Sequence, residues 1–285
     1  LSPLDGRYFE VGEALSPYFS EYALVKNRVW VEINWLVFLL ENIKNSKLLN
    51  TFPKDKIDNI KKIYNDFSSQ SFSKIKEIES VTNHDVKAIE YFIDEELKNN
   101  DMSELVSYIH IGCTSEDINN TAYANMIKNS LNDVWIPKAE ELISFLDDFS
   151  KEYMDLPMLA HTHGQPATPT TVGKEFAVYV YRLKNSLENL KRIKTTAKFN
   201  GATGNYSALS IAFPNENWPA LAKKFVENYL HLTFNPITTQ IEGHDYMCHI
   251  FDAIRHFNNI VLDLDRDMWL YISYEYFGQK VIKNE

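Results

Sequence analysis

Apolar residues recur along most of this chain at the three- and four-residue spacing of α-helices, whereas the strict alternation typical of half-buried strands is nearly absent. Residues 25–40 are apolar with polar residues at intervals, a pattern that predicts a long and mostly buried helix. Residues 53–67 and 86–97 predict two shorter amphipathic helices.

Start signals mark three further helices. Thr114 followed by Asp117 resembles a capping box and predicts a helix through residue 127. Pro137 predicts another helix that begins at this residue, because the missing N–H of proline is harmless in a first turn. A third helix is expected to begin near Thr170 and to carry one apolar face, formed by Phe176, Val180, Leu183, Leu187 and Leu190.

The last helix has the clearest pattern, and we expect it to run from residue 244 to residue 277, with Gly278 as a stop signal. At about 1.5 Å per residue it would be roughly 50 Å long, so we expect helices of other subunits among its neighbours. Its apolar residues recur at spacings of four and three, as in a heptad seam. They are Tyr246, Ile250, Ile254, Phe257, Val261, Leu264, Met268 and Tyr271.

These patterns together predict an all-α fold built on a bundle of long helices. A charged, polar turn at residues 99–102 suggests a boundary. We therefore expect a smaller N-terminal helical domain over residues 1–101 and a central long-helix bundle domain over residues 102–285. Residues 200–210 contain glycines and predict a loop.

Composition narrows the class of function. The net charge of −10 argues against nucleic acid as a partner and means that an anionic ligand needs a local positive pocket. The cysteines Cys113 and Cys248 lack Cys-x-x-Cys spacing, which argues against a disulfide framework or a zinc finger. The sequence has no run of about 18 apolar residues and does not start like a secretory signal. We therefore expect no membrane partner and a cytoplasmic location.

The segment 159–171 carries the most promising chemistry, because it places His161 and His163 beside Gly164 and Gln165 just before a helix. Histidine can donate or accept a proton near neutral pH, so one of the two could be a general acid flanked by the Gln165 amide. Both could instead be structural residues at a helix entry. A metal site is a third interpretation, but no Cys, Asp or Glu stands close by in the sequence.

Two further polar clusters could contribute to the same site. Over residues 82–87, Asn83, His84 and Lys87 could together bind a carboxylate or phosphate, although Asp85 alone suits a helix cap. Over residues 112–117, a Thr-Ser pair at a helix start could be only a cap, or its free N–H groups could bind an anion.

Two more clusters lie near the ends of the chain. Arg7, within Asp5-Gly6-Arg7-Tyr8, could clamp a phosphate in bidentate fashion or be an ordinary surface arginine. Residues 238–242 could be a polar strand or loop before the last helix. Taken together, the clusters supply histidines for proton transfer and several anion-binding groups. This combination suits chemistry on a small, multiply anionic substrate.

At these residues the chain resembles the adenylosuccinate lyases, a family of the fumarase/aspartase superfamily. The matching motifs occur in the family's order and span nearly the whole chain. The sequence Gly164-Gln165-Pro166-Ala167 favours this family, because argininosuccinate lyases and fumarases usually place a leucine where Gly164 stands. The motifs are Asp5-Gly6-Arg7-Tyr8, Thr82-Asn83-His84-Asp85-Val86-Lys87, Cys113-Thr114-Ser115-Glu116-Asp117, Thr162-His163-Gly164-Gln165-Pro166-Ala167 and Thr239-Gln240-Ile241-Glu242.

The resemblance implies a largely α-helical homotetramer of the fumarase/aspartase type, with active sites built from three subunits and no metal or organic cofactor. It implies β-elimination that converts adenylosuccinate to AMP and fumarate, and SAICAR to AICAR and fumarate. Such a reaction needs a base beside a carboxylate, donors for the charge that develops there, and an acid for the departing nitrogen.

The resemblance also implies roles for individual residues. His163 would be the acid, and His84 would help to bind and orient the substrate. Arg7 and Tyr8 would hold the AMP phosphate. The remaining substrate contacts would come from Asn83, Asp85, Lys87, Gln240 and the pair Thr114 and Ser115, which suits the succinyl carboxylates.

One part of the family pattern is missing. The family carries a loop of Ser-Ser-x-Met-Pro-x-Lys-x-Asn type, whose serine is the proposed base, followed by a C-terminal helical domain. The sequence stops at Glu285, where this loop should begin, so we expect the base outside these residues. Two other hypotheses remain open: a lyase of the same superfamily with a different substrate, and a non-catalytic helical scaffold.

Overall fold

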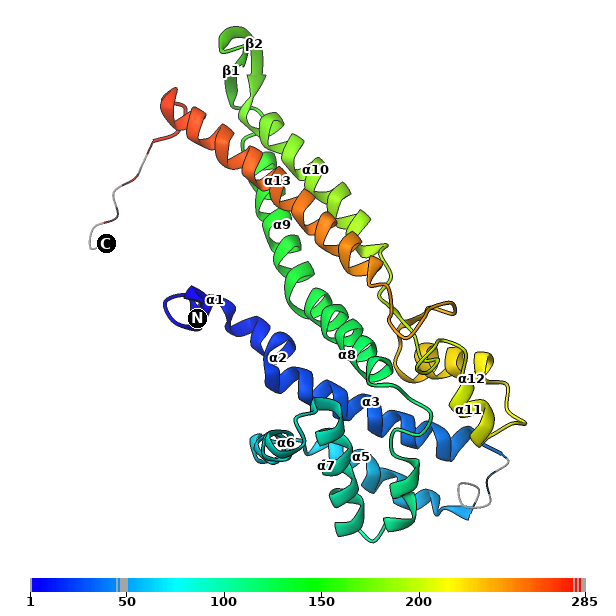
Figure 1. The fold of residues 1–285 in the computed structure, drawn as a ribbon. Coiled ribbons are helices and arrows are strands. Elements are labelled where there is room, and N and C mark those ends of the chain that lie inside the picture. Colours follow the sequence, from blue (N-terminus) through cyan, green and yellow to red (C-terminus); the bar gives the residue numbers. More distant parts are fainter. Residues whose placement is uncertain (1, 45, 47–50, 279, 281, 283–285) are drawn as a thin grey trace. The chain divides into compact units, whose positions relative to one another are not determined.

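The computed structural model of the chain describes residues 2–44, 46, 51–278, 280 and 282. Helices joined by mostly short connections dominate it, and the described residues form only two small two-stranded sheets (Figure 1). The predicted all-α class is confirmed. Contacts divide the chain into two compact units, Leu1–Val134 with Lys194–His244 and Trp135–Ile193 with Asp245–Glu285. The division into domains at residues 101 and 102 stays a prediction.

The first unit is built around α3 (Glu21–Asn42), against which α5, α6, α7 and α8 pack. Short helical turns precede α3, and a small parallel pair of strands with two short helices completes the unit. The α-helices besides α3 are α1 (Phe9–Gly12), α2 (Ser16–Phe19), α5 (Ile57–Asn65), α6 (Ser69–Thr82), α7 (Asp85–Asn99), α8 (Ser115–Ser130), α11 (Ser207–Ala212) and α12 (Trp218–Lys224). The 3-10 and π turns are η1 (Pro3–Asp5), η2 (Glu13–Leu15), η3 (Lys54–Lys56), η4 (Ser103–Tyr108), η6 (Phe225–Tyr229) and η5 (Leu131–Trp135), whose last residue belongs to the second unit, and the strands are β3 (Thr196–Ala197) and β4 (Thr233–Phe234).

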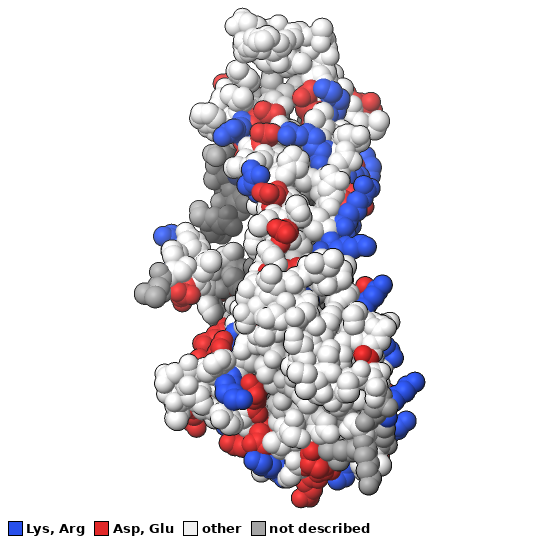
Figure 2. Space-filling view, turned by 45° about the vertical axis from the view of Figure 1, so that its right-hand side comes forward, with Lys and Arg blue, Asp and Glu red and all other residues white. Residues whose placement is uncertain are grey.

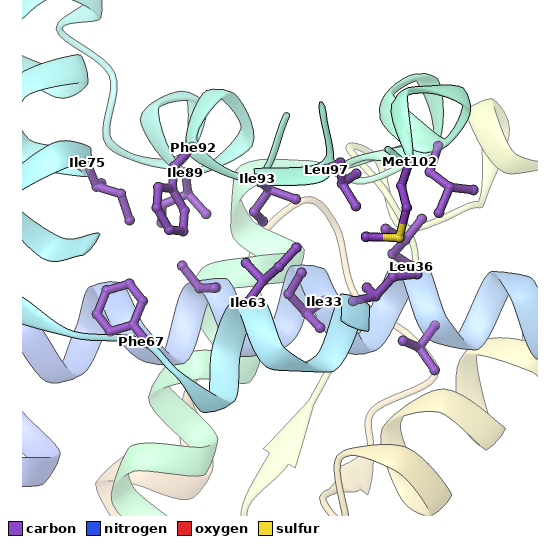
Figure 3. Close-up of a cluster of buried hydrophobic side chains, with 14 of the residues drawn as sticks. Ile33, Leu36, Ile63, Phe67, Ile75, Ile89, Phe92, Ile93, Leu97 and Met102 are labelled. Atoms are coloured by element: carbon purple, nitrogen blue, oxygen red, sulfur yellow. The ribbon is translucent and has the colours of Figure 1, made fainter. Parts of the chain in front are cut away.

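Helix α3 is apolar around most of its circumference because it buries two faces. One face carries Ile33 and Leu36, which pack with side chains of α5, α6 and α7 in the cluster shown in Figure 3. On the other face, Trp35 and Phe38 lie against the aromatic rings of Phe199 and Phe225. A helix surrounded in this way needs no polar stripe, which explains why its pattern predicted a buried helix.

Several predicted helices of the first unit are confirmed with small shifts at their ends. Helix α3 is longer than the predicted 25–40, and α7 covers the predicted 86–97. Thr114 and Asp117 form the predicted capping box, and α8 runs three residues beyond residue 127. The predicted loop at 200–210 is only partly correct, because its last residues begin α11 (Ser207–Ala212).

The second unit is a bundle of three long helices with a β-hairpin at one end (Figure 1). Its helices are α9 (Ile136–Glu152), which has the predicted proline in its first turn, α10 (Val172–Lys191) and α13 (Asp245–Ser273). On the apolar face predicted for α10, Leu190 is buried, and the other four residues pack in the bundle core with Phe257 and Leu264 of α13. The hairpin, which the sequence did not predict, consists of β1 (Pro157–Thr162) and β2 (Gln165–Thr171) in antiparallel pairing.

Helix α13 ends four residues earlier than predicted. Glu275 adopts a left-handed conformation with φ of 62°. The N–H of Glu275 donates to the carbonyl of Ile272, and the N–H of Tyr276 donates to that of Tyr271. These two bonds define a Schellman motif, which terminates the helix before Gly278 can act.

Candidate active site

The β-hairpin presents His163 at its tip. Thr162 pairs with Gln165, so only His163 and Gly164 form the turn. Both have positive φ, 55° and 72°, as a type I′ turn requires. Histidine is one of the few non-glycine residues that enter this region with some frequency. The turn therefore holds an exposed imidazole away from the strands, on a hairpin that carries no Lys, Arg, Asp or Glu (Figure 2).

The structure assigns different surroundings to the two histidines of this motif. His161 stacks on Tyr274, with ring centroids 4.7 Å apart and planes 9° from parallel. The Tyr276 hydroxyl donates to the carbonyl of Leu159, 3.1 Å away, and fixes the same strand. The stacking on Tyr274 gives His161 a structural contact, and its side chain also lines a pocket of about 380 Å³ beside the hairpin. Over the described residues, no three His, Cys, Asp or Glu side chains are arranged to hold a metal ion.

The polar cluster at residues 82–87 lies at the junction of α6 and α7. Asn83 ends α6 in a left-handed conformation with φ of 52°, and His84 is the N-cap of α7. The Nδ1 atom of His84 accepts a hydrogen bond of 3.1 Å from the N–H of Lys87. A neutral imidazole that accepts at Nδ1 carries its proton on Nε2. His84 is half exposed, so this arrangement offers an N–H donor to a ligand.

Arg28 of α3 connects this junction to α8. Its guanidinium forms an ion pair of 2.7 Å with Asp85 and donates a bond of 2.8 Å to Asn119, one turn after Ser115. Burial is the largest single influence and would raise the pKa of Asp85, but the charge and hydrogen bond of Arg28, the N–H of Val86 and the charge of His84 together outweigh it, and the pKa is lowered. Asp85 is therefore held as a carboxylate, and the buried Arg28 links the cluster at residues 82–87 to helix α8.

The cluster at residues 112–117 and the cluster at residues 238–242 are in direct contact. Thr114 donates its backbone N–H to the carboxylate of Asp117, 2.9 Å away. Its hydroxyl accepts a bond of 3.1 Å from the Gln240 amide. Ser115 begins α8 beside this contact, where the first N–H groups of the helix have no partner within the helix. The helix start and Gln240 thus form one polar surface.

The remaining predicted residues have only local contacts. The Arg7 guanidinium lies over the ring of Tyr8, 5.4 Å from its centroid, and Tyr8 is exposed. Lys87 pairs with Glu90 on the same helix, at 2.7 Å. All of the predicted site residues lie in the first unit except His163, which lies in the second. A site that includes them all stays a prediction.

The partly buried His110 pairs with the buried Glu32 of α3, with 2.6 Å between Oε1 and Nδ1. Burial is the largest single influence and would lower the pKa of His110, but the hydrogen bond and charge of Glu32, with the charges of Glu90 and Asp117, together outweigh it, and the pKa is raised. A raised pKa stabilises the fold below the pKa of the unfolded chain, and this contribution is lost as the pH rises through the folded-state value.

We expect His110→Asn, which tolerates the positive φ of 56° at this position, to lower the free energy of unfolding more at pH near 6 than at pH near 9. Urea titrations of both proteins at the two pH values measure the difference. A loss of stability that is equal at both values, or larger at the higher pH, contradicts the assignment.

Comparison with known proteins supports the motifs. A protein-family model described as Lyase matches residues 6–285. The chain belongs to this lyase family. It is 43% identical to the adenylosuccinate lyases of Buchnera aphidicola and Escherichia coli K12 over 286 residues, and 45% identical to that of Dictyostelium discoideum over 292 residues. Each alignment covers the whole of this chain and 62% of the relative, so the chain spans less than two thirds of the length of these proteins.

Solved structures support the lyase-family fold. A fumarate lyase from Mesorhizobium sp. BNC1 matches with a TM-score of 0.74 and 18% identity over 91% of this chain and 57% of its own. A β-carboxy-cis,cis-muconate cycloisomerase from Acinetobacter calcoaceticus sp. ADP1 matches with a TM-score of 0.71 and 19% identity, over 91% of this chain and 57% of its own. The fumarase/aspartase type of fold is thus confirmed.

Sequence reasoning missed several polar residues that organise the site of this lyase-family chain. Arg28 and Glu32 stand four residues apart in a stretch of α3 rich in apolar residues, which was a usable signal for a buried polar contact. Lys198 and Asn200 gave no such signal, because their partner Asp117 lies far away in the sequence. Over the described residues, no helix has the length and apolar character needed to span a membrane.

Proposed function

We propose that the complete protein containing these residues is a cytosolic lyase that cleaves adenylosuccinate to AMP and fumarate, and SAICAR to AICAR and fumarate. The observation that carries the proposal is identity of 43–45% along the whole chain to adenylosuccinate lyases from two bacteria and Dictyostelium. The ordered motifs around His84, Thr114, His163 and Gln240 give this similarity a chemical content.

The reaction is a β-elimination. A base removes a proton from the carbon beside a carboxylate, the electrons of that C–H bond form the C=C bond of fumarate, and the C–N bond breaks. The nitrogen then leaves with a proton supplied by an acid. We assign this acid to His163, because the turn exposes its imidazole. We expect the base in a part of the complete protein that lies outside the described residues.

Donors must stabilise the charge that builds on the carboxylate before the C–N bond breaks. The start of α8 supplies the N–H groups of its first turn and the hydroxyls of Thr114 and Ser115, with the Gln240 amide beside them. The Nε2–H of His84 supplies a further donor that orients the substrate, as the bond at Nδ1 supports.

The remaining contacts follow the same logic. Arg7 and Tyr8 would hold the phosphate of the nucleotide, for which a guanidinium fork is well suited. Asn83, Asp85 and Lys87 would contact the rest of the substrate from the start of α7. We propose no metal or organic cofactor, since the acid, the donors and the expected base account for each step.

We further propose a homotetramer whose active sites combine residues of several copies. In support, the second unit leaves large apolar side chains on α10 and α13 exposed, with Tyr181 and Trp269 each 70% exposed and Phe251 58%. Bundle helices with such faces need further helices to cover them. Active sites assembled from several copies would also explain why the motifs lie in two separate units.

A substrate panel tests the proposal on the complete natural protein. We expect saturable fumarate release from adenylosuccinate and SAICAR, and none from argininosuccinate, aspartate or malate. Light scattering on the same preparation should give the mass of four chains.

If fumarate is released only from argininosuccinate, aspartate or malate, the protein is a lyase of the same superfamily that acts on that compound, and the proposed substrate is wrong. If no fumarate is released and calorimetry detects no saturable binding of AMP or fumarate, the protein is a scaffold and the proposal is wrong.

A further inference from the structure

A buried ion pair lies behind the α8 start. The Lys198 ammonium is 2.9 Å from Oδ1 of Asp117, and both side chains are fully buried. Lys198 also donates to the carbonyl of Gly201, 2.9 Å away. Neither charged group can therefore touch a ligand, and the pair requires an explanation other than direct contact.

The Asp117 carboxylate gathers backbone donors from two segments. Besides Lys198, Oδ1 accepts the N–H of Asn200 at 3.1 Å, while Oδ2 accepts those of Thr114 at 2.9 Å and Gly201 at 3.1 Å. A buried carboxylate is tolerated when its oxygens are saturated with donors in this way. Its effect is to tie the turn before α8 to the loop that begins at residue 198.

A second set of contacts joins these two segments to residues 238–240. The Asn200 amide donates to the Thr238 hydroxyl at 2.8 Å, and the Gln240 amide donates to the Thr114 hydroxyl at 3.1 Å. Gly204 lies so close to Thr238 that an added Cβ would be 2.0 Å from its carbonyl oxygen. The contacts of Asp117, together with those of Thr238 and Gln240, thus fix the relative positions of three segments that are distant in the sequence.

We propose that Asp117 and Lys198 are positioning residues that hold Thr114, Ser115 and Gln240 in the geometry needed to bind the carboxylates of a succinyl group. This inference rests on the proposed function and names residues that the sequence motifs left without a role at the site. The pair acts through the backbone: Asp117 fixes the N–H of Thr114, and Lys198 neutralises the carboxylate that does so.

The test compares Asp117→Asn with the double variant Asp117→Asn/Lys198→Met in the complete protein. An asparagine has one acceptor oxygen where aspartate has two, so with or without Lys198 it cannot hold the N–H groups of Asn200 and Thr114 on two separate oxygens as the carboxylate does. The double variant removes the unpaired buried ammonium and should recover most of the melting temperature that Asp117→Asn loses. We expect kcat/KM for adenylosuccinate to stay about 100-fold below that of the wild type in both, as for a misplaced binding group.

Two more variants keep the result interpretable. Thr121→Val removes a buried hydroxyl of the same helix that bonds only backbone carbonyls of Asp117 and Ile118, and should lower stability without changing KM. Thr238→Val breaks the contact with Asn200 at a half-buried position, so it should fold normally and raise KM several-fold. If the double variant recovers both melting temperature and kcat/KM, or if Thr238→Val leaves KM unchanged, the positioning role is wrong.

Hydrogen–deuterium exchange separates this inference from the proposed function. The amides of Thr114, Asn200 and Gly201 should exchange faster in Asp117→Asn than in Thr121→Val, whatever substrate the protein uses. Equal exchange in the two variants overturns the positioning role, whereas absence of fumarate release from the wild type overturns only the proposed function.

Discussion

Replacing His163 by asparagine should reduce turnover of adenylosuccinate by about 100-fold or more, because the substrate nitrogen then loses its proton donor. The substitution is chosen for the turn. His163 and Gly164 have positive φ, and Asn-Gly is among the most favoured pairs for a type I′ turn. The hairpin should therefore keep its shape and stability while its chemistry is lost. Steady-state kinetics and melting temperature on the complete protein measure both effects.

His161 provides the matched control. His161→Phe keeps an aromatic ring to stack on Tyr274, which lies 4.7 Å away, and should leave turnover close to that of the wild type. His163→Ala should behave like His163→Asn in turnover. If either His163 variant retains nearly full turnover, or if His161→Phe is the one that loses it, the assignment of the acid is wrong.

Helical periodicity was enough to predict most of the fold. The long helices α3, α10 and α13 bury continuous apolar faces, and that burial leaves a pattern in the sequence wherever it occurs. Their ends were harder to place. Glu275 terminates α13 with a left-handed backbone that favours glycine, so the nearby Gly278 was the more visible but incorrect signal.

The hairpin escaped prediction for physical reasons. Pro166 and Pro169 interrupt its second strand, and proline normally argues against a strand because it cannot donate to a neighbour. Within the part of the chain that the structure describes, the two strands pair only with each other, so each has an edge where proline is tolerated. The His-Gly turn is also an uncommon version of a signal usually read from Asn-Gly.

The candidate site was predictable as a set of residues, and less so as a structure. His84, Thr114 and Gln240 could be named from local motifs. The groups that hold them, Arg28, Asp117 and Lys198, act over long sequence separations, so no local pattern connects them. Asp117 was recognised only as a capping residue, which is the local half of what its carboxylate does.

Replacing Gly204 by alanine should cost about 3 kcal/mol of stability and weaken substrate binding. The position has φ of 76°, which disfavours any residue with a Cβ by about 1 kcal/mol. The new Cβ would in addition meet the Thr238 carbonyl oxygen at 2.0 Å and that of Thr239 at 3.1 Å, so backbone must move. Overpacking of this kind costs about 1–3 kcal/mol. The segment displaced is the one that carries Gln240, so KM should rise as well.

Two other glycines separate the backbone effect from the clash. Gly164 also has positive φ, 72°, but its Cβ would have no neighbour within 4 Å, so Gly164→Ala should cost only about 1 kcal/mol. Gly12 lies at the end of α1 with φ of −84° and equally open space, so Gly12→Ala should be nearly neutral. Denaturant titrations of the three variants should give losses that increase from Gly12 to Gly164 to Gly204. A Gly204 variant no less stable than the Gly164 variant would mean that the loop can move away from Thr238, and the close approach would not fix the register of the site.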